Sequence, residues 1–445
     1  MSDTEKASTG ASDAIGGGSD TAVAGAAIST GTSDAISGAV PVADISRIPR
    51  SIWWDIDPIN GRPAVMLIDQ TRLPLTGDVL SCQKLEGIEL AIQTLAVRGA
   101  PALGVAAAMA IAIASENESN ATDIDGWLSE IDAAAARIGA ARPTAVNLAW
   151  AANRTRDYAH EIASTSKTLP ELKAALVQFA CQMAADDEST NRAIGAHGAP
   201  LLPENARVLT HCNAGSLATA YFGTAGAVIY TAYAAGRVSH VWVDETRPLN
   251  QGARLTAWEM MAANVPCTLI TDSMAAHVMQ SGWVDAILVG ADRICANGDT
   301  ANKIGTLALA IAARHFDIPF YICAPLSTVD VSLSDGSLIP IEQRDRRELA
   351  GFTATGTFQT GDELTFRALN TLTASGAKNL EFNQPHEMTV YRKGDGFAFD
   401  GWFMNTPPEL PVYNPAFDVT PAELITAIIC EQGVFAPEQI TSAIS

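Results

Sequence analysis

The chain has 445 residues, of which 48% are hydrophobic and 6% aromatic, so it can bury a large core and is long enough for two domains. Its formal net charge of -21 argues against non-specific binding to nucleic acid or to an anionic membrane, because both depend on clustered Lys and Arg. A few local cationic groups can still hold a small anion.

Cysteine and histidine usage excludes two further classes of protein. The seven cysteines are scattered singly and no CxxC pair occurs, which is typical of reduced thiols in a cytosolic protein rather than of a disulfide framework. The seven histidines form no HxxxH or Cys/His cluster, so we expect no zinc site and no other metal.

Residues 1–45 consist mainly of Gly, Ala, Ser, Thr and Asp. Nothing bulky there can offset the entropy lost on ordering, so we predict a disordered low-complexity tail. The tail lacks the basic and apolar segments of a signal peptide, and the longest apolar stretch of the chain, residues 104–115, is too short to span a bilayer. We therefore expect a soluble, cytoplasmic protein without membrane contacts.

An ordered, mostly helical domain is predicted over 46–200. Two apolar runs within 51–74 flank the sequence INGRP and predict a short β-hairpin. Residues 84–195 then carry apolar side chains at i, i+3 and i+4, which indicates helices, with ARPTA (141–145) as a break.

After residue 205, short β-rich runs alternate with helical stretches such as 217–236 and 252–264. The expected strands are RVLTHC (207–212), SHVWVDE (239–245), PCTLITDS (266–273), DAILVGAD (285–292) and PFYICAP (319–325). Apolar strands that alternate with helices predict a parallel sheet covered on both faces. The fold class is therefore α/β, with a doubly wound, Rossmann-like domain over 201–440 after the smaller helical domain and its hairpin.

Polar residues stand at successive strand ends, where open α/β sheets bind their ligands. Cys212 ends the first of these strands and Asp292 ends the fourth. From position alone, a buried structural cysteine is the alternative interpretation of Cys212. His211 is adjacent to it but should face away, because successive strand side chains point to opposite faces of a sheet. A Cys–His nucleophilic pair is therefore not expected.

Two turns are candidate anion sites. NAGS (213–216) is expected to open a helix whose free N–H groups bind an anion, and within NGDTANKIGT (297–306) Asn302 and Lys303 are expected to enter the next helix. The second turn does not have the Walker A pattern, so it suggests a monophosphate rather than a nucleoside triphosphate. A capped helix with a solvated lysine is the alternative.

Two arginines stand in otherwise apolar surroundings. Arg98 precedes a Gly-Ala-Pro turn, and Arg142 lies in ARPTAVNL with Asn147. Each should bind either the phosphate of a ligand or a carboxylate of the chain itself.

These segments together resemble the methylthioribose-1-phosphate isomerase family. The matching stretches are VRGAPALGVAAA, RPTAVNL, THCNAGSLAT, VDETRPLNQGARLTAWEM, ITDSMAAHVM, VGADRICANGDTANKIGT, PFYICAPLSTVD, IPIEQRD and NPAFDVTPAELITAII. They follow the family order and cover nearly all of residues 50–430. That family shares its fold with the regulatory subunits of the exchange factor for translation initiation factor 2 and with archaeal ribose-1,5-bisphosphate isomerase.

The resemblance implies an aldose–ketose isomerase of methionine salvage, which converts 5-methylthio-α-D-ribose 1-phosphate to 5-methylthio-D-ribulose 1-phosphate. By motif, the catalytic cysteine corresponds to Cys212 and the catalytic aspartate to Asp292. Substrate-binding positions implied in the same way are Arg98, Gly99, Ala100, Arg142, Gln251, Asn302 and Lys303. The family also implies a homodimer, and acid–base isomerisation requires neither a metal nor an organic cofactor.

Two other functions remain open at this stage. One is a ribose-1,5-bisphosphate isomerase, and the other is a non-catalytic protein that binds a sugar phosphate or nucleotide, like the regulatory subunits. The presence of Cys212, Asp292 and NQGARLTAWEM (250–260) favours catalysis. Residues 351–413 depart from the family pattern, which has a short loop there. We expect a small helix and strands in this insertion, as a surface elaboration, a cover of the active site or a subunit contact.

Overall fold

The computed structural model describes residues 45–142, 146–165, 167–359, 387–393, 396–407 and 409–444. The tail expected at 1–45 lies outside these residues apart from Ile45, and so does most of the expected ARPTA break.

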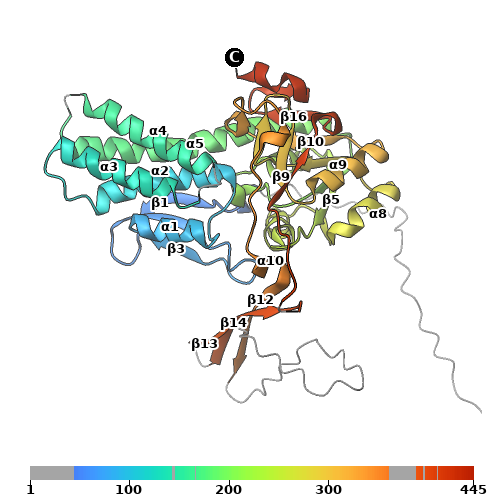
Figure 1. Ribbon diagram of the computed structural model, residues 1–445, viewed down its shortest axis with the longest axis horizontal. Helices are drawn as coiled ribbons and strands as arrows, with labels where there is room; N and C mark the ends of the chain where they lie inside the picture. The colour runs from blue at the N-terminus through green and yellow to red at the C-terminus, as the bar shows by residue number, and fades with distance from the viewer. Residues whose placement is uncertain are drawn as a thin grey trace, which may run out of the picture. The chain divides into compact units, whose positions relative to one another are not determined.

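Three antiparallel strands and five helices build the N-terminal part of the described chain (Figure 1). The strands are β1 (Ile52–Ile56), β2 (Pro63–Ile68) and β3 (Val79–Cys82), and the helices are α1 (Leu85–Gln93), α2 (Ala100–Asn117), α3 (Ile124–Gly139), α4 (Val146–Ala163) and α5 (Leu169–Gly198). β1 pairs with β2, with Trp54 opposite Val65, which confirms the expected hairpin. The sequence does not predict β3, because VLSC is only four residues long and has no alternating pattern that marks a strand.

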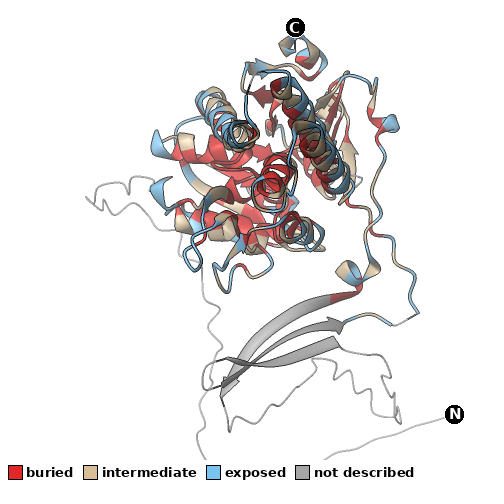
Figure 2. Ribbon diagram, turned by 90° about the vertical axis from the view of Figure 1, so that its left-hand side faces the viewer, coloured by how far each residue is buried: buried red, intermediate tan, exposed pale blue. Residues whose placement is uncertain are grey.

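Helix α2 is the core helix of this region. Helices α1, α3, α4 and α5 all pack against it, and its alanines allow their close approach. Among the described residues it is the one helix long and apolar enough to cross a membrane, yet 72% of it is buried inside the protein. The helix extends beyond the apolar stretch 104–115 at both ends. Figure 2 shows buried residues in the interior and exposed ones along the outer helices.

Seven strands form the central sheet, in the order β17-β16-β10-β7-β4-β5-β6. They are β4 (Ala206–Thr210), β5 (Val238–Asp244), β6 (Cys267–Ile270), β7 (Ala286–Val289), β10 (Phe320–Cys323), β16 (Ala427–Cys430) and β17 (Gly433–Phe435). All neighbours are parallel except β17, which is antiparallel to β16. The chain adds β5 and β6 on one side of β4, then β7, β10 and β16 on the other. This is the strand order of the doubly wound, Rossmann-like fold, as predicted.

Successive strand residues pack into two separate cores, one on each face of the sheet. Val208 and Leu288 belong to the core that contains α6 (Ala225–Ala234), whereas their neighbours Leu209 and Ile287 belong to the core of α8 (Ala275–Gln280) and α9 (Thr306–His315). A strand buried on both faces has no polar alternation, which explains the continuous apolar runs of the sequence.

One of the two expected helices begins later than predicted. Within 217–236 a short 3-10 helix, η3 (Ser216–Ala218), is followed by an irregular segment in which Phe222 and Gly223 have φ values of 80° and 77°, and α6 begins only after it. The other begins where it was expected. Within 252–264 the chain starts as a π-helix, η4 (Gly252–Thr256), and continues as α7 (Ala257–Ala262).

A further, four-stranded sheet has the order β11-β8-β9-β15. Its strands are β8 (Arg293–Cys295), β9 (Thr300–Lys303), β11 (Val329–Asp330) and β15 (Phe417–Thr420). Asn302 and Lys303 lie in β9, so the prediction that they enter a helix is wrong. They pair with Asp418 and Phe417 of β15, a partner far away in the sequence, and α9 begins only after Gly305.

The insertion contains a sheet of its own, of three strands. Helix α10 (Arg346–Ala350) leads into β12 (Gly351–Gln359), and β14 (Gly396–Met404) pairs antiparallel with both β12 and β13 (Glu387–Lys393). The strands expected in 351–413 are therefore present. The helix expected around 361–382 lies outside the described residues.

Asp187 of α5 ties this helix to the loop that follows β4. Its Oδ2 accepts hydrogen bonds from the N–H of Ala220 at 2.7 Å and from the side-chain amide of Asn191 at 3.0 Å. Burial nevertheless raises the pKa of Asp187 to about 7, against the opposing effect of these donors.

We expect Asp187 to make the protein less stable as the pH rises. A carboxyl whose folded-state pKa is raised from 3.8 to about 7 contributes stability that is complete at low pH and is lost as the pH approaches that folded value. Asp187→Asn has no carboxyl to titrate at this position. The free energy of unfolding of the wild type should therefore fall relative to that of the variant as the pH rises from about 5 to about 8. Urea unfolding of both proteins over this range measures the difference, and parallel curves would contradict the expectation.

Candidate active site

Cys212 and Asp292 lie where the strand order of the central sheet reverses. Cys212 comes just after β4 and Asp292 just after β7, and these two strands are hydrogen-bonded neighbours. The carboxyl ends of parallel strands meet at one edge of the sheet, so both residues reach the crevice in which this fold binds ligands.

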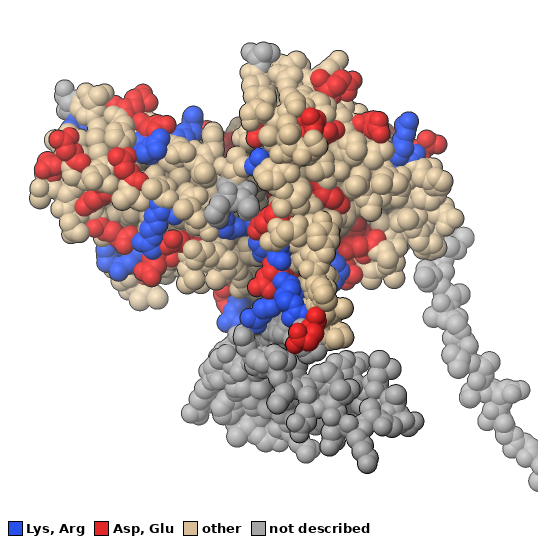
Figure 3. Space-filling view, viewed as in Figure 1, with Lys and Arg blue, Asp and Glu red and all other residues tan. Residues whose placement is uncertain are grey.

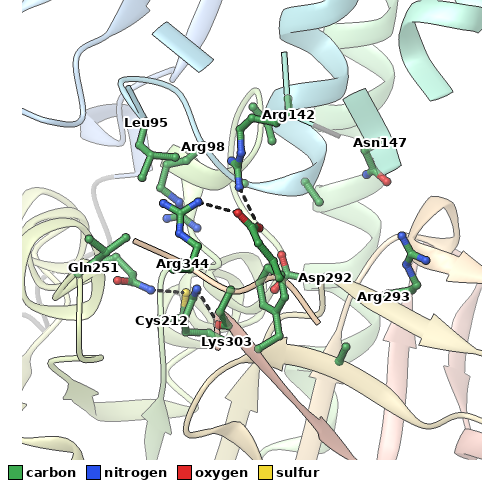
Figure 4. Close-up of a pocket in the computed structure, with 18 of the residues that line it drawn as sticks. Leu95, Arg98, Arg142, Asn147, Cys212, Gln251, Asp292, Arg293, Lys303 and Arg344 are labelled. Atoms are coloured by element: carbon green, nitrogen blue, oxygen red, sulfur yellow. Dashed lines mark hydrogen bonds and ion pairs between the residues drawn. The ribbon is translucent and has the colours of Figure 1, made fainter. Parts of the chain in front are cut away.

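A pocket opens at this point, and eight of the nine expected site residues line it (Figure 4). They are Arg98, Gly99, Ala100, Arg142, Cys212, Gln251, Asp292 and Lys303. The ninth, Asn302, lines a smaller adjoining pocket, and its amide donates to Thr306 Oγ1 at 3.0 Å. Cys212 and Asp292 line both pockets, so they stand where the two meet.

The thiol of Cys212 is held by its surroundings rather than by its own strand. The residue is 8% exposed and has a φ of 64°, a left-handed conformation that is rare outside glycine. Its N–H donates to Thr246 Oγ1 at 2.8 Å, and its carbonyl accepts from Thr256 Oγ1 at 2.7 Å. The Gln251 amide points at the sulfur, with Nε2 3.3 Å from Sγ (Figure 4). These contacts fix the direction of the thiol at the pocket wall.

Asp292 is a partly buried carboxyl in a cationic pocket. Burial raises its pKa above the usual range, against the opposing charges of Lys303, Arg98 and Arg142. Its backbone N–H donates to the Ala301 carbonyl at 2.9 Å. Within the described residues its side chain forms no hydrogen bond, so the carboxyl is available to a ligand. A carboxyl with a raised pKa next to cations is suited to act as a general acid.

The pocket arginines differ in what holds them. Arg98 donates to the side-chain oxygen of Asn213 at 2.8 Å and to its carbonyl at 3.0 Å. Arg142 instead lies 3.7 Å from the carboxylate of Glu342, which also accepts from Arg344 at 2.8 Å. Arg142 thus contacts a carboxylate of the chain itself, whereas the hydrogen bonds of Arg98 within the described residues go to neutral oxygens.

At both turns expected to bind an anion, carboxylates of the chain bind N–H groups at the helix start. The N–H groups of Ser216 and Leu217 donate to Glu259 at 2.7 and 3.1 Å. Those of Gly305 and Leu307 donate to Asp418 at 2.8 and 3.1 Å. The N–H groups of Ser216, Leu217, Gly305 and Leu307 are therefore not free for a ligand, so neither helix start binds an anion in the way expected.

The N-terminus of α2 remains open instead. Among the described residues we find no acceptor for the N–H groups of Gly99, Ala100 and Ala102, and Gly99 and Ala100 line both pockets. Gly99 has a φ of 98°, and a Cβ there would overlap the backbone of Ala218. A helix N-terminus beside Arg98 is a suitable site for an anion.

Lys303 reaches the pocket from the end of β9. Its Nζ donates to the Ala416 carbonyl at 2.9 Å and lies 4.8 Å from the centre of the Phe417 ring. A ligand anion would add to these contacts without having to displace a carboxylate.

Sequence reasoning missed several lining residues. Arg254 lies in NQGARLTAWEM beside Gln251, and its guanidinium donates to the carbonyls of Leu249 and Gln70 at 3.1 and 3.2 Å. Arg344 belongs to IPIEQRD, one of the stretches that match the family. A charged residue in such a stretch could have indicated that it lines the pocket. Apolar lining comes from Leu95, Leu103, Val146, Leu249, Leu255, Ile339 and Phe417.

His211 turns away from Cys212, as expected. Its Nδ1 lies 3.0 Å from Asp244 Oδ2, and its Nε2 lies 2.9 Å from the Ile304 carbonyl. Burial lowers the pKa of His211, but the hydrogen bond and charge of Asp244 outweigh this effect and raise it. Asp272 completes a group whose side chains are close enough to share a metal, but its carboxylate accepts the N–H groups of Thr246 and Arg247. Hydrogen bonds within the chain therefore account for this cluster.

Acidic and basic side chains are interspersed over the face of the molecule drawn in Figure 3. This distribution agrees with the net charge of -21, which disfavours a nucleic-acid surface.

Residues 96–437 match the model of the initiation factor 2 subunit family. A methylthioribose-1-phosphate isomerase of Chloroflexus aurantiacus is 44% identical over 393 residues, which cover 88% of this chain and 97% of that protein. Another, of Nostoc punctiforme, is 45% identical over 380 residues and covers 85% of this chain and 93% of that protein.

Two solved structures share the fold over nearly their whole length. The 5-methylthioribose 1-phosphate isomerase of Pyrococcus horikoshii has a TM-score of 0.72 and 38% identity, covering 89% of this chain and 97% of that one. A structure described as the delta subunit of translation initiation factor eIF-2B from A. fulgidus has a TM-score of 0.68 and 38% identity, covering 88% and 97%.

Proposed function

The chain belongs to the methylthioribose-1-phosphate isomerases of the initiation factor 2 subunit family, and on this premise we propose that it isomerises 5-methylthio-α-D-ribose 1-phosphate to 5-methylthio-D-ribulose 1-phosphate in methionine salvage. The observation that carries this proposal is that a thiol and a carboxyl, Cys212 and Asp292, line the same cationic pocket.

The substrate dictates what the site must do. Its anomeric carbon carries a phosphate, so the ring does not open spontaneously as in a free aldose. The bond between C1 and the ring oxygen must break as that oxygen takes up a proton. Loss of the proton from C2 gives an enol, and a proton at C1 with loss of the C2 hydroxyl proton gives the ketone. One acid near the ring oxygen and one group near C1 and C2 are therefore required.

In our proposal Asp292 protonates the ring oxygen and later moves protons between oxygens. Burial, which raises its pKa, keeps the acid form available. Cys212 removes the C2 proton as a thiolate and returns it to C1 as a thiol. A hydride shift from C2 to C1, with Cys212 in a supporting role, is the alternative route to the same product.

The phosphate and hydroxyl groups need donors, which the pocket has. We propose that Arg98 and the N-terminus of α2, with Gly99 and Ala100, bind the phosphate. Arg142 and Lys303 would add positive charge, and Gln251 and Asn302 would bind hydroxyl groups. Holding the sugar in this way brings C1 and C2 to the thiol.

The lining of the pocket favours the methylthio sugar over ribose 1,5-bisphosphate. Leu95, Leu103 and Leu255 offer the apolar contacts that a methylthio group needs, whereas a second phosphate needs free cations. Two further arginines that line the pocket, Arg344 and Arg293, are not free. Arg344 pairs with Glu342, and Arg293 lies 3.6 Å from Asp330.

A direct assay separates the candidate functions. The purified protein is mixed with 5-methylthioribose 1-phosphate, and with ribose 1,5-bisphosphate in parallel, and both reactions are followed by carbon NMR. We expect a C2 carbonyl signal in the first reaction only. A signal in the second alone would assign the protein to the bisphosphate branch.

A carbonyl signal in neither reaction would favour a binding role like that of the translation-factor relatives.

The proposal also includes a cytoplasmic homodimer. The mass of the protein in solution, measured by light scattering, tests the dimer directly.

A further inference from the structure

Within the part of the chain that the structure describes, the guanidinium of Arg98 is hydrogen-bonded to one residue. Its two hydrogen bonds there go to Asn213, one to the side-chain oxygen at 2.8 Å and one to the carbonyl at 3.0 Å. Neither oxygen is charged. Arg142 and Arg344, in the same pocket, face the carboxylate of Glu342 instead.

The side chain of Asn213 has a defined orientation. Its amide nitrogen donates to Glu259 Oε1 at 2.9 Å and to Thr256 Oγ1 at 3.2 Å. A carboxylate accepts hydrogen bonds and cannot donate them, so the amide nitrogen must face Glu259 and the amide oxygen must face Arg98. Asn213 is 3% exposed, so water does not compete for these contacts.

Glu259 is a fully buried carboxylate that contacts no cation among the described residues. It accepts from Asn213, from the N–H groups of Ser216 and Leu217 at 2.7 and 3.1 Å, and from the Tyr230 hydroxyl at 3.0 Å. Gly215 permits this approach, because a Cβ there would collide with the carboxylate. Glu259 therefore fixes the turn that carries Asn213.

We propose that Asn213 is a positioning residue, which with Glu259 directs Arg98 at the substrate phosphate without pairing the arginine with a carboxylate of the chain. This inference rests on the isomerase activity proposed above. The buried carboxylate supplies rigidity, and the neutral amide between it and Arg98 transmits the geometry without an ion pair. A carboxylate in direct contact with Arg98 would hold the arginine equally well but would compete with the phosphate.

Asn213→Asp tests this, because it places a negative charge against Arg98 with little change in shape, although it also replaces the amide donor that faces Glu259 with an acceptor. We expect KM for 5-methylthioribose 1-phosphate to rise about tenfold or more while kcat changes less than about threefold. The inhibition constant of inorganic phosphate should rise in parallel. Asn213→Ala removes the contact without adding a charge, so its KM should rise less than that of Asn213→Asp.

Tyr230→Phe is the matched control. It removes another hydrogen bond of the same buried carboxylate, but one that does not lead to Arg98, so the thermal midpoint should fall while KM stays unchanged. If Asn213→Asp does not fold, a rise of KM in Asn213→Ala but not in Tyr230→Phe still supports the proposal.

Two results would overturn the inference while the wild type remains active. One is a KM within about twofold of wild type in Asn213→Asp, and the other is a KM in Asn213→Ala at least as high as in Asn213→Asp. A wild type that does not turn over the substrate would instead refute the proposed function.

Discussion

Cys212→Ala is expected to reduce kcat by about a thousandfold, with a KM within a few-fold of the wild type. The thiol is the proposed carrier of the C2 proton, and its sulfur is held at the pocket wall by the Gln251 amide. Removing a small buried side chain leaves the main-chain contacts with Thr246 and Thr256 in place, so the variant should fold. Turnover by NMR and the circular dichroism spectrum measure the two expectations.

Cys430→Ala is the appropriate control for this variant. Cys430 is a buried free cysteine in β16 of the same sheet and lines neither pocket, so its loss should leave turnover intact. A Cys212→Ala protein with more than about a tenth of wild-type kcat would remove the thiol from the mechanism. Wild-type turnover in D2O tests the hydride route, because a proton held on the thiol can exchange with solvent and place deuterium at C1, whereas a hydride shift cannot; deuterium at C1 would exclude the hydride shift.

The central sheet is predictable from sequence because its signals are local. The run RVLTHC becomes β4 and DAILVGAD becomes β7, in each case with the apolar residues inside the strand and the polar residue beyond its end. The strand-end rule then brings Cys212 and Asp292 together without knowledge of the three-dimensional fold.

The local rule fails where a distant partner decides the structure. NAGSLAT has the composition of a helix start, but Glu259 binds the N–H groups of Ser216 and Leu217, and the α-helix begins only at Ala225. Asn302 and Lys303 form a strand because β15, which follows the whole insertion, pairs with them. A short stretch of sequence does not reveal such distant partners. The start of a helix and the N–H groups that are free to bind an anion are therefore predicted wrongly for the same reason.

The charges of the pocket show the same limit. Lone arginines are visible in the sequence, but which of them face a carboxylate is a property of the folded chain. Glu342 lies 200 positions beyond Arg142 and contacts it, whereas Arg98 contacts Asn213. The difference between an occupied and an available cation therefore had to come from the structure.

Asp292→Asn should lower kcat by a factor of about 10² to 10⁴, since an amide cannot give up a proton to the ring oxygen. The amide keeps the size of the carboxyl, so KM should change little. The pH profile supplies an independent readout. Because the acid form is the active one, wild-type kcat should fall as the pH rises through the raised pKa of Asp292, and this limb should be absent in the variant.

Asp272→Asn is the control for Asp292→Asn, because Asp272 is also a strand-end carboxylate but lines neither pocket. It accepts the N–H groups of Thr246 and Arg247, so its loss should lower stability while activity stays near wild type. If Asp292→Asn retained the alkaline limb, another group would have to be the acid. Glu342 is the other carboxyl among the described residues that line the pocket, so Glu342→Gln would then be expected to remove the limb instead.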